Sequence, residues 1–236
     1  MTEIPQKGKI WTVIANDQSE WTNRNSVVKS PLEIPLKQRT PTAYFVNSQH
    51  DLFYNDGSVE AFDQLDNIFG TMFLTPWHTY FVVTKNPANM YQYLDPTDTR
   101  QSPYRVSKWV EAANTISWSK LKRKNRFNLP DFKLPLSHVY FGVAVENQQT
   151  ADNRIPWVLK TTAAKRFLVY NPSEKIEVYP YLTSAFRECP RPIGDPHPIV
   201  LDFVIAKATN DNSDLVRDLA RQCEGANIPF FTPVLS

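Results

Sequence analysis

Short apolar runs alternate with helix-like segments along most of this chain, and this alternation constrains its fold more than any other feature. Runs of β-branched and aromatic residues predict strands, and longer segments with apolar residues every three or four positions predict helices. The predicted strands are residues 43–46, 79–84, 139–145, 166–170 and 199–206, with a last short strand beginning at residue 229. The predicted helices are residues 58–73, with Ser58 as N-cap, residues 149–161, interrupted by Pro156, and residues 213–225, capped by Ser213 and ended by Gly225.

The predicted strands are apolar almost throughout, so both of their faces are expected to be buried. Buried strands separated by helices predict an α/β fold with a parallel sheet and right-handed crossovers, here a partial or closed parallel barrel. A chain of 236 residues suits one such domain, and we expect residues 1–236 to form it. Residues 94–135 break the alternation and are expected to be an insertion, either a lid over the barrel or a protein-binding surface.

Composition excludes several classes of protein. No run approaches 18 apolar residues and the first ten residues lack an apolar signal core, so no membrane span or secretion signal is predicted and a cytoplasmic location is expected. Cys189 and Cys223 are the only cysteines, which is too few for a disulfide framework and lacks the clustered spacing of a metal site. A net charge of +2 does not by itself indicate a nucleic-acid partner.

Polar residues follow the predicted strands where each strand ends. In a parallel barrel, all strands deliver their carboxyl ends to one rim, where active sites are built. The side chains expected to converge at this rim are Asn47, Ser48, Asp51, Thr84, Lys85, Glu146, Asn147, Asn171 and Lys207. His50 and His78 could ligate a metal, although a single rim histidine is more often a hydrogen-bonding surface residue.

Five segments between about residues 42 and 231 resemble, in the same order, a phage-borne family of largely unknown biochemistry, the radical-SAM-like three-Cys-motif proteins. These segments are YFVNSQHDLF, LTPWHTYFVVTKNPANM, VYFGVAVENQQTADNRIPWVL, TTAAKRFLVYNP and VRDLARQCEGANIPFF. The resemblance implies a partial (β/α) barrel of radical-SAM type. In that family, three closely spaced cysteines after the first strand are expected to hold an iron–sulfur cluster that cleaves S-adenosylmethionine.

The sequence departs from the family pattern at its reactive positions. Residues 9–12 keep an echo of the opening strand, but residues 13–30 contain no cysteine, and the two cysteines further along cannot replace a cluster of three. Residues 1–41 are therefore expected to be a degenerate N-terminal segment, and no metal or other cofactor is expected. Four further family motifs have changed type and appear here as Lys85-Asn86-Pro87, Tyr170-Asn171-Pro172, Ile205-Ala206-Lys207-Ala208-Thr209 and Thr232-Pro233-Val234-Leu235.

A retained scaffold with a changed rim indicates a pseudoenzyme. The rim residues that still match the family pattern are Asn47, Ser48, Asp51, Thr84, Lys85, Glu146, Asn147 and Gln148, and the resemblance implies that they could bind a polar ligand or its phosphates. The alternative is that these groups satisfy one another and cap adjacent loops. The favoured hypothesis is a non-catalytic, cluster-free protein of phage or mobile-element origin that binds a host protein in the host cytoplasm, in a counter-defence or inhibitor role.

Two other hypotheses stay open. The first is a nucleotide or single-stranded nucleic-acid binder that uses the rim together with a basic run flanked by Trp109, Trp118 and Phe127. The basic side chains of this run are Lys120, Lys122, Arg123, Lys124 and Arg126, although such a run is more often a solvated face. The second is a cofactor-independent enzyme with acid/base chemistry at Asp51, Lys85 and Glu146, which requires a carboxylate and a lysine within hydrogen-bond reach.

Overall fold

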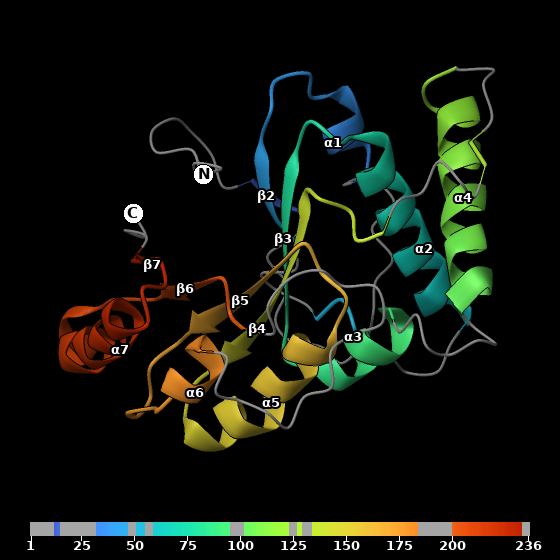
Figure 1. Ribbon diagram of the computed structural model, residues 1–236. Helices are drawn as coiled ribbons and strands as arrows, with labels where there is room; N and C mark the ends of the chain where they lie inside the picture. Colours follow the sequence, from blue (N-terminus) through green and yellow to red (C-terminus); the bar gives the residue numbers. More distant parts are fainter. Residues whose placement is uncertain are drawn as a thin grey trace.

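The strands form one parallel sheet whose spatial order is their order in the chain (Figure 1). The computed structural model describes residues 12–14, 32–46, 51–54, 59–94, 102–122, 127–128, 134–183 and 200–232. Its strands are β1 (Thr12–Ile14), β2 (Ala43–Val46), β3 (Thr79–Thr84), β4 (Val139–Val145), β5 (Lys165–Tyr170), β6 (Phe203–Ala206) and β7 (Phe230–Phe231). Each strand pairs in parallel with the next, and β1 and β7 lie at the two ends of a curled sheet. The predicted α/β fold is confirmed in its partial-barrel form.

Helices connect these strands and lie mainly on the outer side of the curled sheet (Figure 1). They are α1 (Glu33–Lys37), α2 (Val59–Leu74), α3 (Pro87–Leu94), α4 (Ser102–Ser119), α5 (Gln148–Lys160), α6 (Tyr179–Leu182) and α7 (Ser213–Gly225), with a 3-10 turn, η2 (Asn210–Asn212), before α7. None of the helices in these described parts of the chain is long and apolar enough to cross a membrane.

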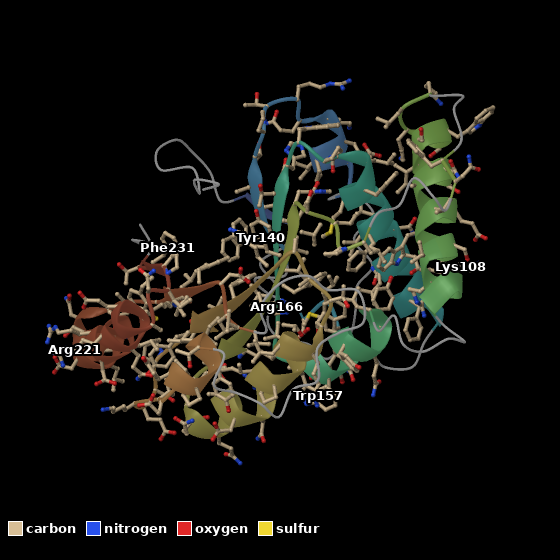
Figure 2. All side chains as sticks on the ribbon, in the orientation of Figure 1. Lys108, Tyr140, Trp157, Arg166, Arg221 and Phe231 are labelled. Carbon is tan, nitrogen blue, oxygen red and sulfur yellow. The ribbon has the colours of Figure 1, made fainter. Side chains whose placement is uncertain are left out.

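The two faces of the sheet carry separate hydrophobic clusters. Side chains alternate along a strand, so Tyr80 and Val82 of β3 join the main core with the helices while Phe81 joins the other cluster. That second cluster consists of Phe81, Phe167, Phe203 and Ile205, packed against Ala43, Phe45, Val83, Tyr140, Val169 and Phe231; Figure 2 labels Tyr140 and Phe231. Apolar side chains on both faces explain why the strands are unbroken hydrophobic runs in the sequence.

The region predicted to be an insertion contains α4, which runs alongside α2 rather than across the ends of the strands (Figure 1). Trp109, Ala113 and Ile116 recur at helical spacing and enter the main core. Gly70 lets the two helices approach closely, because a Cβ at this position would lie 2.9 Å from the backbone nitrogen of Ala113. The helix therefore extends the core of the barrel.

A buried polar network joins α2, α3 and α4. The hydroxyl of Tyr93 donates to Oδ1 of Asp66 at 2.6 Å, and Nε1 of Trp109 donates to the Tyr93 hydroxyl at 2.8 Å. Nη1 of Arg105 lies 3.3 Å from each carboxylate oxygen of Asp66, and its guanidinium packs over the rings of Phe62 and Tyr93. Each of the three helices thus contributes a polar group that the other two help to satisfy.

One helix differs from its prediction. The sequence predicted a helix interrupted by Pro156, but α5 runs through this proline without a break. Proline lacks the N–H that would donate to the carbonyl of Asp152, so the helix continues past Pro156 without this one hydrogen bond. A second difference is the strand predicted over residues 199–206, which begins only at Phe203 within the described part.

Candidate functional site

The carboxyl ends of β2, β3 and β4 bring together most of the polar residues predicted for the rim. Asp51 follows β2, Thr84 and Lys85 end β3, and Glu146 and Asn147 follow β4. Because these three strands are adjacent and parallel, their ends must lie side by side. Gln148 begins α5 directly after them, whereas Asn47 and Ser48 lie outside the described residues.

The carboxylate of Asp51 is the centre of the first half of this rim. Its Oδ1 accepts from the Thr84 hydroxyl at 2.6 Å and from the backbone N–H of Phe53 at 3.0 Å. Its Oδ2 accepts from the backbone N–H of Lys85 at 2.6 Å and from Nδ2 of Asn86 at 2.9 Å. Four donors therefore converge on one carboxylate, and they tie the loop after β2 to the loop after β3.

The carboxylate of Glu146 is the centre of the second half. Nζ of Lys85 lies 2.9 Å from Oε1, and Nη1 of Arg154 lies 2.9 Å from Oε2. Arg154 reaches back from α5 and also donates to the backbone carbonyl of Ala144 in β4. The ion pair between Lys85 and Glu146 thus bridges the ends of β3 and β4, with about half of the lysine side chain exposed to solvent.

Two further predicted rim residues, Asn147 and Gln148, fasten the start of α5, while Asn171 and Lys207 directly follow β5 and β6. Asn147 is the N-cap of α5 and forms a reciprocal capping box with Thr150. Gln148 accepts from the backbone N–H of Glu177 at 2.6 Å and donates to Oδ1 of Asp152 at 2.8 Å. These contacts agree with the alternative in which rim groups satisfy one another and cap adjacent loops.

The acid/base hypothesis required a carboxylate and a lysine within hydrogen-bond reach. Lys85 and Glu146 meet this requirement at 2.9 Å, but the second oxygen of Glu146 is bound by Arg154. Asp51 belongs to a separate cluster of hydrogen bonds whose donors include the backbone of Lys85, rather than its ammonium group. The arrangement therefore suits a fixed surface better than a proton-transfer site.

Two residues that complete this site were not predicted to belong to it. Asn86 belongs to one of the motifs in which the sequence departs from the resembling family, and its side chain donates to Asp51. Arg154, to which the sequence assigned no role at the rim, supplies a guanidinium group to it through Glu146. Its spacing of eight residues from Glu146 carries no recognisable motif, because only the turn between β4 and α5 brings the two together.

The expected role of His78 at the rim is wrong, because this residue precedes β3 at the opposite end of the sheet. It is 1% exposed, and its Nδ1 accepts from the backbone N–H of Thr42 at 3.1 Å. Its Nε2 must then carry the proton that is donated to the carbonyl of Pro35 at 3.0 Å. Burial lowers the pKa of His78, so the ring is held neutral. His50 lies outside the described residues.

The described cysteine is also remote from the rim. Cys223 is buried in α7, and burial raises the pKa of its thiol to about 12, which disfavours the thiolate that binds metals. Cys189 lies outside the described residues. Among the residues whose positions the structure gives, no three His, Cys, Asp or Glu side chains are grouped so that they could hold a metal ion.

The basic run is only partly described. Nζ of Lys120 lies 2.6 Å from Oε1 of Glu33, and Lys122 is exposed. Arg123, Lys124 and Arg126 lie outside the described residues. Of the flanking aromatic residues, Trp109 is buried in the core, Phe127 packs edge-on against Phe73, and Trp118 is 67% exposed. Trp118 is the only one of the three that presents a largely open ring for stacking.

We expect replacement of Asp51 by alanine to lower the free energy of unfolding by about 2 kcal/mol, because it leaves four donors without their shared acceptor. Urea denaturation would measure the change. Asp211→Ala, which removes an exposed aspartate on η2, is the matched control and is expected to stay within about 0.5 kcal/mol of the original protein. Equal effects of the two substitutions would show that Asp51 does not hold the loops together.

Comparison with known proteins identifies the family of this chain. Neither the curated proteins nor the solved structures contain a match. A family described as "Protein of unknown function (DUF5131)" matches residues 3–233. This match covers nearly the whole chain, including the half-barrel and every rim residue discussed above. The chain therefore belongs to the DUF5131 family of proteins of unknown function.

Proposed function

We propose that this protein is a non-catalytic, cluster-free pseudoenzyme with a radical-SAM-like half-barrel, and that it acts by binding a host protein. The observation that carries the proposal is the state of the rim. Asp51 receives four donors and Glu146 faces two cations, all from this chain. Carboxylates committed in this way hold loops in place, which is what a rigid binding scaffold needs.

The chemistry of the cysteines supports the cluster-free part of the proposal. Iron in radical-SAM clusters is held by closely spaced thiolates, and the sequence has no cysteine before Cys189. The other cysteine, Cys223, lies in the core of α7 with a raised pKa. The radical-SAM type and the phage or mobile-element origin derive from the sequence resemblance alone.

The outer face of α4 supports protein binding over a role as a lid. Glu111, Thr115 and Trp118 are exposed and lie at helical spacing on one stripe of this helix. A tryptophan that is 67% exposed is a large apolar group in water, and tryptophan is among the residues that contribute most to protein interfaces. We therefore assign Trp118 as an anchor for the host protein.

Affinity purification from the host cell tests the binding role. We expect the tagged protein to retain one host protein in stoichiometric amount, and Trp118→Ala to reduce that amount at least about tenfold. Tyr179→Ala removes another exposed aromatic side chain, 43% exposed on α6, and is expected to retain the partner. Failure to recover any stoichiometric protein would refute the binding role, and retention by Trp118→Ala would refute the assignment of α4.

Anaerobic purification tests the absence of a cluster. We expect no stoichiometric iron and no formation of 5′-deoxyadenosine from S-adenosylmethionine. Detection of both would overturn the pseudoenzyme proposal.

Filter binding of single-stranded DNA and RNA at low and high salt tests the nucleic-acid hypothesis, for which salt-sensitive binding would be the positive result.

A further inference from the structure

A cluster of buried titratable side chains lies at the amino end of the sheet, away from the rim. His78 is its central member and contacts both α1 and the residues that lead from α1 into β2. Its Nε2 binds the carbonyl of Pro35 in α1, and its Nδ1 binds the N–H of Thr42 just before β2. The ring of Tyr44 packs edge-on against the imidazole, with ring centroids 5.0 Å apart. Both nitrogens of His78 are therefore committed, and only the neutral ring fits both contacts. Burial lowers the pKa of the ring more strongly than interactions with the backbone of Pro35 and Gln38 raise it.

We propose that His78 is an acid-sensitive latch, and that its protonation releases α1 and the link to β2 from the sheet. A proton on Nδ1 would point at the N–H of Thr42, so an acceptor would become a second donor. The charged ring would also be buried, since His78 is only 1% exposed. Because Pro35 and Thr42 bind the two ring nitrogens, movement of residues 35–42 would release both contacts and open the charged ring to water.

The other titratable and charged side chains around the latch come from every element that packs there. They are Glu33 and Lys37 of α1, Arg39 between α1 and β2, Tyr44 of β2, Tyr80 of β3, His138 before β4 and Lys120 after α4. Lys120 and Lys37 lower the pKa of Glu33 to about 2, so this carboxylate stays charged in mild acid. Burial raises the pKa of both tyrosines, which stay neutral. Between pH 7 and 5, the histidines are thus the members of this group expected to change charge.

His138 provides a natural comparison because it is similar in chemistry but different in its contact. Its Nε2 lies 2.9 Å from the carbonyl of Met72 and must donate to it. A protonated ring keeps this donor, so protonation of His138 does not break the contact. Burial lowers the pKa of His138 as well, and the charge of His78 lowers it further. The latch therefore depends on His78, whose acceptor nitrogen is lost on protonation.

The direction of the pH effect follows from the lowered pKa of His78. The folded protein binds the proton less tightly than the unfolded chain, whose histidine titrates near 6.5. The contribution of the neutral ring is complete above pH 6.5 and decreases as the pH falls below that value. The titration of one such group can change the equilibrium between the bound and released positions of residues 35–42 by at most about tenfold per pH unit.

Hydrogen exchange followed by mass spectrometry tests the latch in the intact protein. After correction for the intrinsic pH dependence of exchange, we expect protection of residues 33–44 to fall about tenfold between pH 7 and 5. Residues 139–145 in β4 serve as the internal reference and are expected to keep their protection. Unchanged protection of residues 33–44 would overturn the proposal.

Two variants assign the effect to one histidine. Glutamine offers both an acceptor and a donor but does not titrate near neutral pH, so His78→Gln is expected to abolish the pH dependence. His138→Gln is the matched control and is expected to retain it. If the protection of residues 33–44 fell between pH 7 and 5 as much in His78→Gln as in the original protein, the assignment would be overturned.

A measurement on the unaltered protein covers the case in which His78→Gln fails to fold. In an NMR titration, the imidazole signal of His78 and the amide signal of Thr42 are expected to move with one midpoint below pH 6.5. A Thr42 amide that does not respond while His78 titrates would also refute the latch.

Discussion

Replacing Asp66 by alanine is expected to lower the free energy of unfolding by about 3–5 kcal/mol, as found when one partner of a buried ion pair is removed. Asp66 is 5% exposed and accepts from the hydroxyl of Tyr93. The substitution would leave Arg105, which is 9% exposed, facing a cavity where its carboxylate partner had been. Because this network joins three helices, α3 and α4 are expected to loosen against α2.

Asp63→Ala is the matched control for this experiment. Asp63 lies three residues earlier on α2 and is exposed, so its loss is expected to change stability by no more than about 0.5 kcal/mol. Urea denaturation followed by circular dichroism would compare the variants. A difference between them of less than about 1 kcal/mol would show that the network contributes little to the docking of the helices.

The pKa of Asp66 gives the same experiment a second readout. Burial raises this pKa more than Tyr93 and Arg105 lower it. The folded state therefore binds a proton at this carboxyl more tightly than the unfolded chain does, and this favourable contribution is present at low pH and lost as the pH rises through the folded-state pKa. Asp66→Ala is expected to remove this contribution, and a comparison of unfolding curves between pH 4 and 7 would detect its loss.

Replacing Gly142 by valine is expected to destabilise the protein by about 3 kcal/mol or more, through overpacking of the second cluster. A Cβ at this position would lie 2.6 Å from two ring atoms of Phe167, a distance that real contacts do not reach. The ring cannot easily move, because Phe167 is fully buried and stacks on Phe203 with ring centroids 4.9 Å apart. Even the single methyl group of alanine would force a rearrangement.

Gly225→Ala is the control for the glycine experiment. A Cβ at Gly225 would meet only Tyr179, at an ordinary contact distance of 3.6 Å. We expect this change to be neutral or stabilising by up to about 1 kcal/mol, since alanine is favoured over glycine in helices. Thermal unfolding would rank the variants. If Gly142→Val unfolded within about 2 °C of Gly225→Ala, the close packing of Phe167 over Gly142 would be disproved.

The parts of the fold that the sequence predicted well are those fixed by local composition. The strands at residues 79–84 and 139–145 were predicted residue for residue, because each is an unbroken apolar run between polar ends. The helix at residues 213–225 also has the predicted bounds, since Gly225 marks its end, but its N-cap is Asn212 rather than the predicted Ser213. Their parallel pairing followed from the alternation of strands and helices.

The parts that were missed depend on contacts between distant segments. Helix α4 was not predicted, because its apolar stripe of Trp109, Ala113 and Ile116 lies among polar residues that include the buried Arg105. An arginine at such a position predicts an exposed face of a helix, and its burial is explained only by the ion pair with Asp66 on another helix.

The candidate site shows the same division. Parallel topology was sufficient to predict that Asp51, Thr84, Lys85 and Glu146 meet at one rim. Topology could not show that the carboxylates of Asp51 and Glu146 are already bound by groups of the same chain. That depends on the conformation of the loops and on the contact that Arg154 of α5 makes with Glu146. The misplacement of His78 has a different cause: this residue directly precedes the predicted strand at residues 79–84, so it belongs at the amino end of the sheet, and assigning it to the rim was an error of interpretation.

The order of the strands in the sheet also bears on how this protein is made. Since every strand lies beside its predecessor in the chain, no strand has to wait for a distant segment before it can pair. A ribosome that releases the chain from its amino end would therefore deliver each strand and helix to a neighbour already in place. Assembly of the described strands could then advance in step with translation, from β1 to β7.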